Sequence, residues 1–113
     1  MKLYWAPMSP FVRKVMICAH ETRTVERIDC IETSVSMGEP NASLQVDNPL
    51  SKIPTLVLDD GSALYDSRAI CEFLDSLSDG PSLFPNGPAR WDAARRHSLG
   101  DGMMDTLILW GQE

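Results

Sequence analysis

Ser9 and Pro10 stand where an apolar helical pattern begins, and this pair could bind an anion. A serine hydroxyl at a helix cap accepts from free backbone amides, and proline at the first helical position has no amide proton to leave unbonded. The same geometry places a hydroxyl and unbonded amides at the positive end of a helix, which suits an anion such as a thiolate. Ser9 is therefore interpreted as a helix cap, an anion ligand, or both.

Asp66 and Ser67 form a second pair of this kind, before another apolar helical pattern. Taken alone, the pair is typical of a plain helix cap with an acidic residue in the first turn, worth about 0.5–2 kcal/mol. A binding role for the pair depends on what accompanies it in the chain.

Cys18, Cys30 and Cys71 are the remaining candidates for chemistry. They are odd in number and widely spaced, they include no Cys-x-x-Cys pair, and only His20 and His97 could join them at a metal. This pattern disfavours a disulfide framework or a zinc site and favours a reducing, cytosolic compartment. We expect all three to be small buried or half-buried side chains without a catalytic role.

A strand, a helix and a second strand are predicted to position Ser9. Residues 1–5 are prone to form a strand, which residues 6–8 break. Apolar residues recur at intervals of three and four over residues 11–21, which predicts an amphipathic helix. Residues 24–31 alternate loosely between apolar and polar and suit a second strand. Together these elements make a βαβ unit of roughly 30 residues.

A hairpin and a second helix are predicted to follow. Residues 32–52 are irregular, with one short helical piece over 42–47. Residues 55–58 and 63–65 flank the turn sequence DDGS and predict a β-hairpin, and the spacing over 67–77 predicts a helix. The predicted fold class is α/β: a four-stranded mixed sheet with helices packed on it, in the order of a thioredoxin-like domain.

Residues 79–88 contain three prolines and two glycines, which no regular element tolerates. We expect a linker here, between a domain over 1–78 and a helix over 89–113. That helix has more apolar side chains than a lone surface helix needs. It is interpreted as the first helix of an incomplete all-α domain, so that the chain would be the front part of a larger protein.

The composition limits the possible partners. The chain has 113 residues, 43% hydrophobic and 23% charged, and its 10 basic and 16 acidic residues give a net charge of −6. This charge repels phosphate backbones and anionic membranes, so nucleic-acid and membrane binding are disfavoured. No apolar run approaches the roughly 20 residues that span a bilayer, and we expect no signal peptide.

Three segments together resemble the cytosolic glutathione transferases, in order and at the usual separations: residues 9–15, 48–56 and 64–70. Their sequences are SPFVRKV, NPLSKIPTL and LYDSRAI. The resemblance covers about residues 1–80 and implies the family's thioredoxin-like, glutathione-binding N-terminal domain, in a serine-type, bacterial-like member. The linker and last helix resemble the start of the family's all-helical second domain.

The resemblance implies a catalytic role for Ser9, which lies four places before Arg13 of the first helix and would hydrogen-bond the glutathione sulfur. Tyr4, nine places before Arg13, does not match the tyrosine used by other classes of the family. Neither Ser9 nor Val12, which align with the redox pair of thioredoxins, is a cysteine, so dithiol redox chemistry is disfavoured.

The other two motifs imply the remainder of the glutathione site. By resemblance, the backbone of Ile53 pairs with the cysteinyl part, and a cis peptide bond leads to Pro54. Ser67 with the helix amides would hold the γ-glutamyl carboxylate, and Asp66 would contact the amino group. Lys52 either reaches the glycyl carboxylate or is a solvated surface lysine. Glutathione is then a co-substrate, and no metal or bound cofactor is implied.

The function implied is that of a glutathione transferase, a cytoplasmic homodimer that activates the glutathione thiolate for attack on a small electrophile. Two alternatives stay open: a non-catalytic interaction or regulatory module with the same fold, and a glutathione-dependent isomerase or dehalogenase. The presence of Ser9, Asp66 and Ser67 favours competence to bind glutathione. Substrate choice would lie in the second domain, so the electrophile does not follow from these residues.

Overall fold

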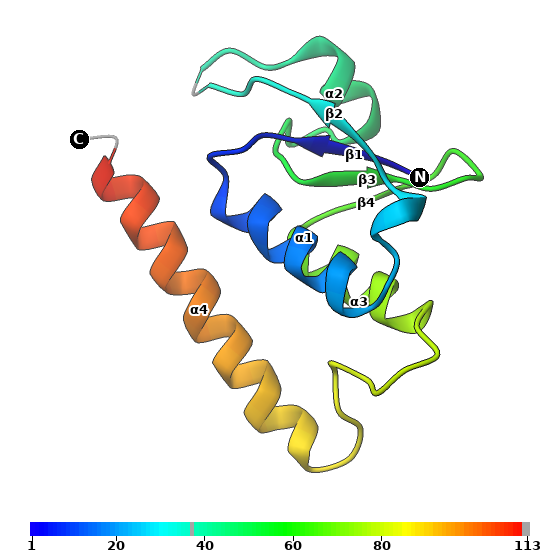
Figure 1. Cartoon of the computed structure of the whole chain (residues 1–113). Coiled ribbons are helices and arrows are strands. Elements are labelled where there is room, and N and C mark those ends of the chain that lie inside the picture. The colour runs from blue at the N-terminus through cyan, green and yellow to red at the C-terminus, as the bar shows by residue number, and fades with distance from the viewer. Residues whose placement is uncertain (37, 112–113) are drawn as a thin grey trace. The chain divides into compact units, whose positions relative to one another are not determined.

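The N-terminal part of the chain folds around a four-stranded mixed sheet (Figure 1). The computed structural model describes residues 1–36 and 38–111, and the chain divides into two units, the first ending at Gly80 and the second beginning at Pro81. The described residues form these elements, in chain order: β1 (Lys2–Trp5), α1 (Pro10–Glu21), the 3₁₀ helix η1 (Val25–Arg27), β2 (Asp29–Glu32), α2 (Ala42–Asp47), β3 (Thr55–Val57), β4 (Ala63–Leu64), α3 (Ser67–Ser76) and α4 (Ala89–Gly111).

The strands follow the order β2-β1-β3-β4. β1 pairs in parallel with β2, where Leu3 faces Cys30, and antiparallel with β3, where Leu3 faces Leu56. β3 and β4 form an antiparallel hairpin. Because α1 joins the parallel pair and α3 follows the hairpin, the chain reads βαβ and then ββα. The predicted α/β class with a thioredoxin-like arrangement is confirmed.

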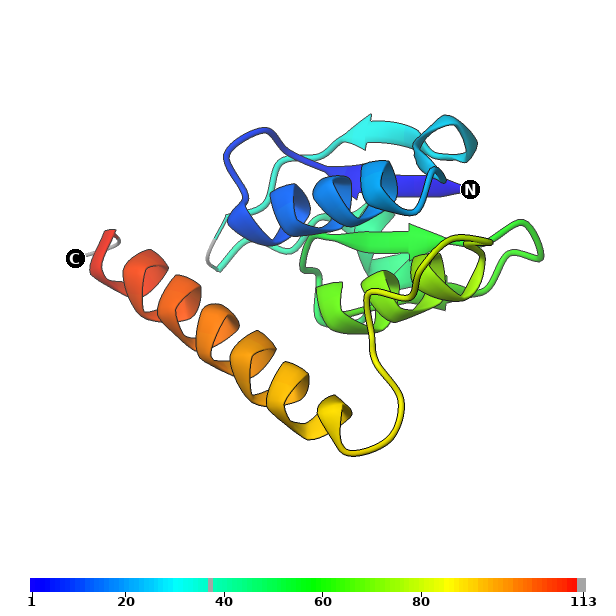
Figure 2. The same ribbon diagram turned by 60° about the horizontal axis from the view of Figure 1, so that its bottom comes forward.

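Two helices cover one face of this sheet, and α2 lies on the other face (Figure 2). α1 packs against α3, which also contacts β3, while α2 contacts β3 from its own side. The side chains buried between these layers include Val15 and Ala19 of α1 and Ile70 and Leu74 of α3. Burying a Val, Leu or Ile side chain stabilises a fold by about 1.5–3 kcal/mol. This packing holds the first turns of α1 and α3 in place relative to the sheet.

The segment after α1 differs from the strand predicted over 24–31. Its first half is the turn η1, and β2 begins only afterwards. The Arg27 amide donates to the Thr24 carbonyl over 2.9 Å, and the buried Thr24 hydroxyl lies 2.9 Å from that of Thr22. These local hydrogen bonds use backbone groups that a longer strand would need, so the prediction was wrong for the first half of the segment.

Two of the three cysteines are buried, and the third is not. Cys18 and Cys71 lie between α1 and α3, where the Cys18 thiol donates to the Cys71 carbonyl oxygen over 3.5 Å. Cys30 is exposed, so the prediction that all three are buried or half-buried was wrong for this residue. The reason is its place in β2, an edge strand whose four residues are all exposed.

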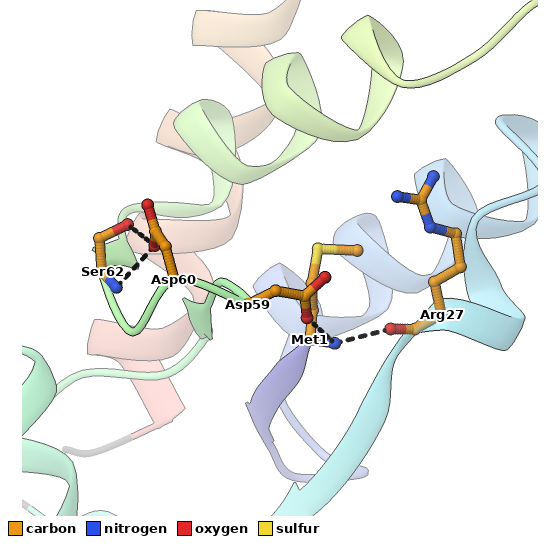
Figure 3. Close-up of polar contacts among 5 residues, drawn as sticks. All are labelled: Met1, Arg27, Asp59, Asp60 and Ser62. Carbon is orange, nitrogen blue, oxygen red and sulfur yellow. Dashed lines mark hydrogen bonds and ion pairs between the residues drawn. The ribbon is translucent and has the colours of Figure 1, made fainter.

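The amino group of Met1 ties the start of β1 to two neighbouring segments (Figure 3). It donates to the Arg27 carbonyl over 2.9 Å and forms an ion pair of 3.2 Å with the Asp59 carboxylate. In the adjoining turn, the Asp60 carboxylate accepts from the hydroxyl and amide of Ser62, at 2.6 and 2.9 Å, and these bonds lower the pKa of Asp60. The turn predicted between the hairpin strands is therefore closed by its own side chains.

The C-terminal unit contains the long helix α4. The helix predicted over 89–113 is confirmed for Ala89–Gly111, and its last two residues lie outside the described ones. Residues 79–88 contain no helix or strand. No helix in the described ranges 1–36 and 38–111 is long and apolar enough to cross a membrane. The large apolar side chains exposed on α4 are Trp91, Leu99, Met103, Leu107, Ile108, Leu109 and Trp110.

Candidate functional site

Three loops leave the sheet at one end, which we call the loop end. β1 finishes beside the start of β3, because Tyr4 pairs with Thr55 in an antiparallel register. β4 finishes beside the same start, because Leu64 pairs with Leu56. The loop after β1, the loop before β3 and the loop after β4 are therefore neighbours, and α1 and α3 both begin there (Figure 2). These loops and the first residue of α3 include every site residue that the sequence singled out.

Ser9 caps α1 at the loop end. Its hydroxyl oxygen accepts a hydrogen bond of 3.2 Å from the Val12 amide, and Pro10 is the first helical residue. Because the oxygen accepts in this bond, the hydroxyl proton can donate to another group. The dipole of α1 makes the surroundings of the hydroxyl electropositive. The cap predicted from the sequence is confirmed, and its geometry is compatible with an anion at the same hydroxyl.

The Ile53–Pro54 peptide bond is cis, which confirms the expectation drawn from the resemblance. Pro54 is buried, Ile53 is half-buried, and the Lys52 side chain is exposed. The Lys52 carbonyl oxygen accepts from the Thr55 hydroxyl at 2.8 Å and from the Asn48 side-chain amide at 3.3 Å. The backbone of this segment is thus held from its buried side while the lysine reaches solvent.

Asp66 and Ser67 stand at the start of α3. The Asp66 carboxylate accepts from the Arg68 amide at 3.0 Å and is the N-cap. Ser67 is the first helical residue and only 3% exposed. The peptide bond between Tyr65 and Asp66 is cis as well, which the sequence did not predict. The cap predicted for this pair is made by Asp66, and the remaining amides of the first turn are available to an anion.

Tyr4 lies on β1, but its hydroxyl is bonded to α2. It donates to the Asp47 carboxylate over 2.6 Å and lies 3.4 Å from the Ser43 carbonyl oxygen. The hydrogen bond with Asp47, burial and the charge of that carboxylate raise the pKa of Tyr4. Tyr4 therefore fastens α2 to the sheet.

Asn48 and Thr55 are neighbours of the site that sequence reasoning missed. Both side chains are fully buried, and a hydrogen bond of 3.0 Å joins them. A buried polar side chain needs partners inside the fold. The signal that could have found them is a pair of polar residues flanking the Lys52–Pro54 segment within one motif.

The chemistry available at the loop end is that of anion and zwitterion binding. Two helices begin there, and the segments at this end carry two serines, an aspartate and a lysine: Ser9, Ser67, Asp66 and Lys52. Within residues 1–36 and 38–111, no group of three or more His, Cys, Asp or Glu side chains could hold a metal ion. The residues present fit a ligand with carboxylates, an ammonium group and an acidic thiol.

The sequence of this chain is similar to a known family and to known proteins. The family "Glutathione S-transferase, N-terminal domain" matches residues 8–77. The GST-like protein YibF of Escherichia coli is 34% identical over 111 residues, which are 96% of this chain and 52% of that protein. Glutathione S-transferase 2 of Saccharomyces cerevisiae is 27% identical over 89 residues, or 78% of this chain and 38% of that protein.

Solved structures are similar to this chain in fold as well as in sequence. A glutathione transferase family member from Pseudomonas fluorescens, with bound glutathione, is similar at 45% identity and a TM-score of 0.93, covering 96% of this chain and 53% of that chain. A glutathione S-transferase from Methylobacillus flagellatus, also with glutathione bound, is similar at 39% identity and a TM-score of 0.75, over 95% of this chain and 52% of that one. The chain thus spans about half the length of these structures.

The family match takes in residues 8–77, more than half of the chain, and includes Ser9 and the loops before β3 and after β4. The fold of the solved relatives is the same over nearly the whole chain. This chain therefore belongs to the glutathione S-transferase family.

Proposed function

We propose that this chain binds glutathione at the loop end of its sheet and uses Ser9 to hold the thiol as a thiolate for attack on a small electrophile. The observation that carries the proposal is that two helix N-termini and the loop before β3 lie at the same end of the sheet. A relative that is 45% identical contains bound glutathione, which supports the same ligand here.

Each end of the tripeptide is assigned a partner. Ser67 and the free amides of α3 receive the γ-glutamyl carboxylate, and Asp66 attracts the amino group beside it. The backbone of Ile53, directly before Pro54, pairs with the cysteinyl part. The exposed side chain of Lys52 extends to the glycyl carboxylate. These assignments leave the thiol facing the start of α1.

Ser9 then acts on the sulfur. A free thiol has a pKa of about 8.5, so keeping it mostly ionised at neutral pH takes about two units of depression, or about 2.7 kcal/mol. A hydrogen bond from the Ser9 hydroxyl to the charged sulfur contributes about 1.5–3 kcal/mol, and the start of α1 about 0.3–1 kcal/mol. The two effects together amount to about 1.8–4 kcal/mol, a range that includes the free energy required. The thiolate electron pair forms the carbon–sulfur bond, and the leaving group departs with the electrons of the bond that breaks.

We also propose a domain organisation, an oligomeric state and a location for this protein. Residues 1–78 are the glutathione-binding domain, residues 79–88 the linker, and residues 89–113 the first helix of an all-α domain. We propose a homodimer because the apolar side chains exposed on α4 favour association. We propose a cytoplasmic location because the number and spacing of the cysteines suit a reducing compartment.

Calorimetric titration of the 113-residue chain with glutathione tests the proposal. We expect saturable binding that Ser67→Ala weakens at least about tenfold, since a hydrogen bond to a charged group is worth about 1.5–3 kcal/mol. Ser76→Ala is the matched control, because Ser76 lies at the other end of α3, where its exposed hydroxyl donates to the Phe73 carbonyl. A folded wild-type chain that does not bind glutathione contradicts the proposal.

Turnover assays separate the functions that share glutathione binding. If the free thiol of glutathione and an electrophilic aryl halide are consumed together, the chain is a transferase. Halide release or substrate isomerisation with glutathione recovered unchanged identifies the dehalogenase or isomerase alternative. Binding with no turnover of any such substrate identifies an interaction or regulatory module.

A further inference from the structure

Asn48 is a fully buried amide that directs the loop before β3. It ends α2, and its side chain is 0% exposed. Its Nδ2 donates to the Thr55 hydroxyl at 3.0 Å and to the Lys52 carbonyl oxygen at 3.3 Å, while its Oδ1 accepts from the Leu50 amide at 2.9 Å. One side chain therefore holds the loop at its beginning, near its middle and at its end.

Thr55 completes this network from the first position of β3. Its side chain is also 0% exposed, and its hydroxyl donates to the Lys52 carbonyl oxygen at 2.8 Å. The same hydroxyl accepts from Asn48, so both of its hydrogen-bonding functions are used inside the protein. We call Asn48 and Thr55 the loop clamp.

The loop clamp fixes the direction of one peptide group. The Lys52 carbonyl and the Ile53 amide belong to the same planar peptide unit, and this unit is trans. In a trans peptide the carbonyl and the amide proton point in opposite directions. Since two buried donors draw the Lys52 oxygen inward, the Ile53 amide proton points away from the clamp.

The backbone just before that peptide group also depends on Asn48. Ser51 has φ of +53°, a left-handed conformation that non-glycine residues rarely adopt. Its amide donates to the Asn48 carbonyl oxygen at 2.9 Å, and its hydroxyl accepts from the Asn41 amide at 3.0 Å. Such a conformation persists only where surrounding contacts enforce it.

We propose that Asn48 and Thr55 are positioning residues that aim the Ile53 amide at the cysteinyl part of glutathione. This inference rests on the proposed function and deepens it. Neither side chain contacts the ligand, because both are fully buried. They act through the Lys52–Ile53 peptide group, whose orientation they set.

Thr55→Val and Thr55→Ser test the clamp as a matched pair. Valine has the shape of threonine but lacks the hydroxyl, whereas serine keeps it. We expect glutathione binding to weaken about tenfold in Thr55→Val, because the Lys52 carbonyl and the Asn48 side-chain amide each lose one of their two hydrogen bonds. Thr55→Ser is expected to recover most of this loss. Ser76→Ala, far from the clamp, is expected to bind as the wild type does.

Amide hydrogen exchange supplies a readout that general destabilisation would not reproduce. At saturating glutathione, the Ile53 amide gains protection in the wild type and in Thr55→Ser and gains none in Thr55→Val. The amides at the start of α3 gain protection in all three proteins. Loss of protection at both places alike in Thr55→Val would overturn the inference, because it indicates only a weaker fold.

The outcomes keep the two proposals apart. Equal affinity and equal Ile53 protection in Thr55→Val, with a wild type that binds, overturn the clamp and leave the proposed function standing. A folded wild type that fails to bind glutathione overturns the proposed function and this inference with it. If Thr55→Val does not fold, Thr55→Ala carries the same test, since it removes the same two hydrogen bonds without placing a methyl group where the hydroxyl was. Fast exchange of the Leu50 and Ser51 amides in the wild type also overturns the clamp.

Discussion

Ser9 and Val12 are joined across the first turn of α1 by a hydrogen bond of 3.2 Å, in which the Val12 amide donates and the Ser9 hydroxyl oxygen accepts. The oxygen serves the helix, and the hydroxyl proton stays available for a second bond. Capping and thiolate binding therefore use different parts of one hydroxyl group. Substitution can separate them, because aspartate caps a helix but has no proton to donate at neutral pH.

Ser9→Ala is expected to lower the free energy of unfolding by about 1 kcal/mol, because the Val12 amide loses its acceptor. Ser9→Asp is expected to keep the wild-type value within about 0.5 kcal/mol, because a carboxylate also accepts and suits the positive end of α1. Urea denaturation followed by circular dichroism measures both. A Ser9→Ala variant as stable as the wild type would show that the cap contributes nothing to stability.

Asp66→Asn is expected to leave stability unchanged and to weaken glutathione binding by up to about fivefold. Asparagine still caps α3 through its oxygen, but it lacks the charge that attracts the ligand's amino group, and exposed ion pairs contribute about 0.2–1 kcal/mol. Asp66→Ala should lose about 1 kcal/mol of stability in addition. Calorimetry and urea denaturation compare the two variants. Wild-type affinity in Asp66→Asn would refute the role assigned to the carboxylate.

Tyr4→Phe is expected to lower the free energy of unfolding by about 0.5–1 kcal/mol at pH 7, because α2 loses its hydrogen bond to β1. The hydrogen bond with Asp47 raises the pKa of Tyr4 in the folded chain above its unfolded value of about 10. This contribution is therefore fully present below pH of about 10 and is lost as the pH rises through the folded pKa. Urea denaturation of both proteins across this range should show the difference shrinking, and a constant difference would exclude the ionisation of Tyr4 as its source.

Cys30 is expected to react with iodoacetamide well before Cys18 and Cys71, because it alone of the three is exposed. Partial burial and the neighbouring Asp29 carboxylate raise the pKa of Cys30, so its rate should climb at a higher pH than that of a free thiol. Asp29→Asn should move the rate profile back toward lower pH. Mass spectrometry of labelled peptides assigns the site, and rapid labelling of Cys18 or Cys71 in the folded chain would contradict the packing of α1 on α3.

Elements with local signals could be predicted from the sequence. Ser9 and Pro10 mark the start of α1, and the helix indeed runs from Pro10 to Glu21. The short helical piece expected over 42–47 is α2, and the hairpin around DDGS is present because the Asp60 and Ser62 side chains close it locally. In each case the residues that decide the structure are neighbours in the chain.

Features that depend on distant partners could not be predicted. The partner of Tyr4 is 43 residues away, and the exposure of Cys30 depends on the order of strands in the sheet. Within the candidate site, the motifs indicated the segment that ends at Pro54. The buried bonds of Asn48 and Thr55, which hold that segment, follow only from the packing of α2 against β3.

The central claim is that Ser9 holds the glutathione thiol as a thiolate, and a pH titration of bound glutathione tests it most directly. The ultraviolet absorbance of the thiolate would be recorded at saturating glutathione for the wild type, Ser9→Ala and Ser9→Asp. We expect the bound thiol to titrate well below about 8.5 in the wild type and near or above that value in both variants. The same titration midpoint in all three proteins, with glutathione bound in each, would contradict the account.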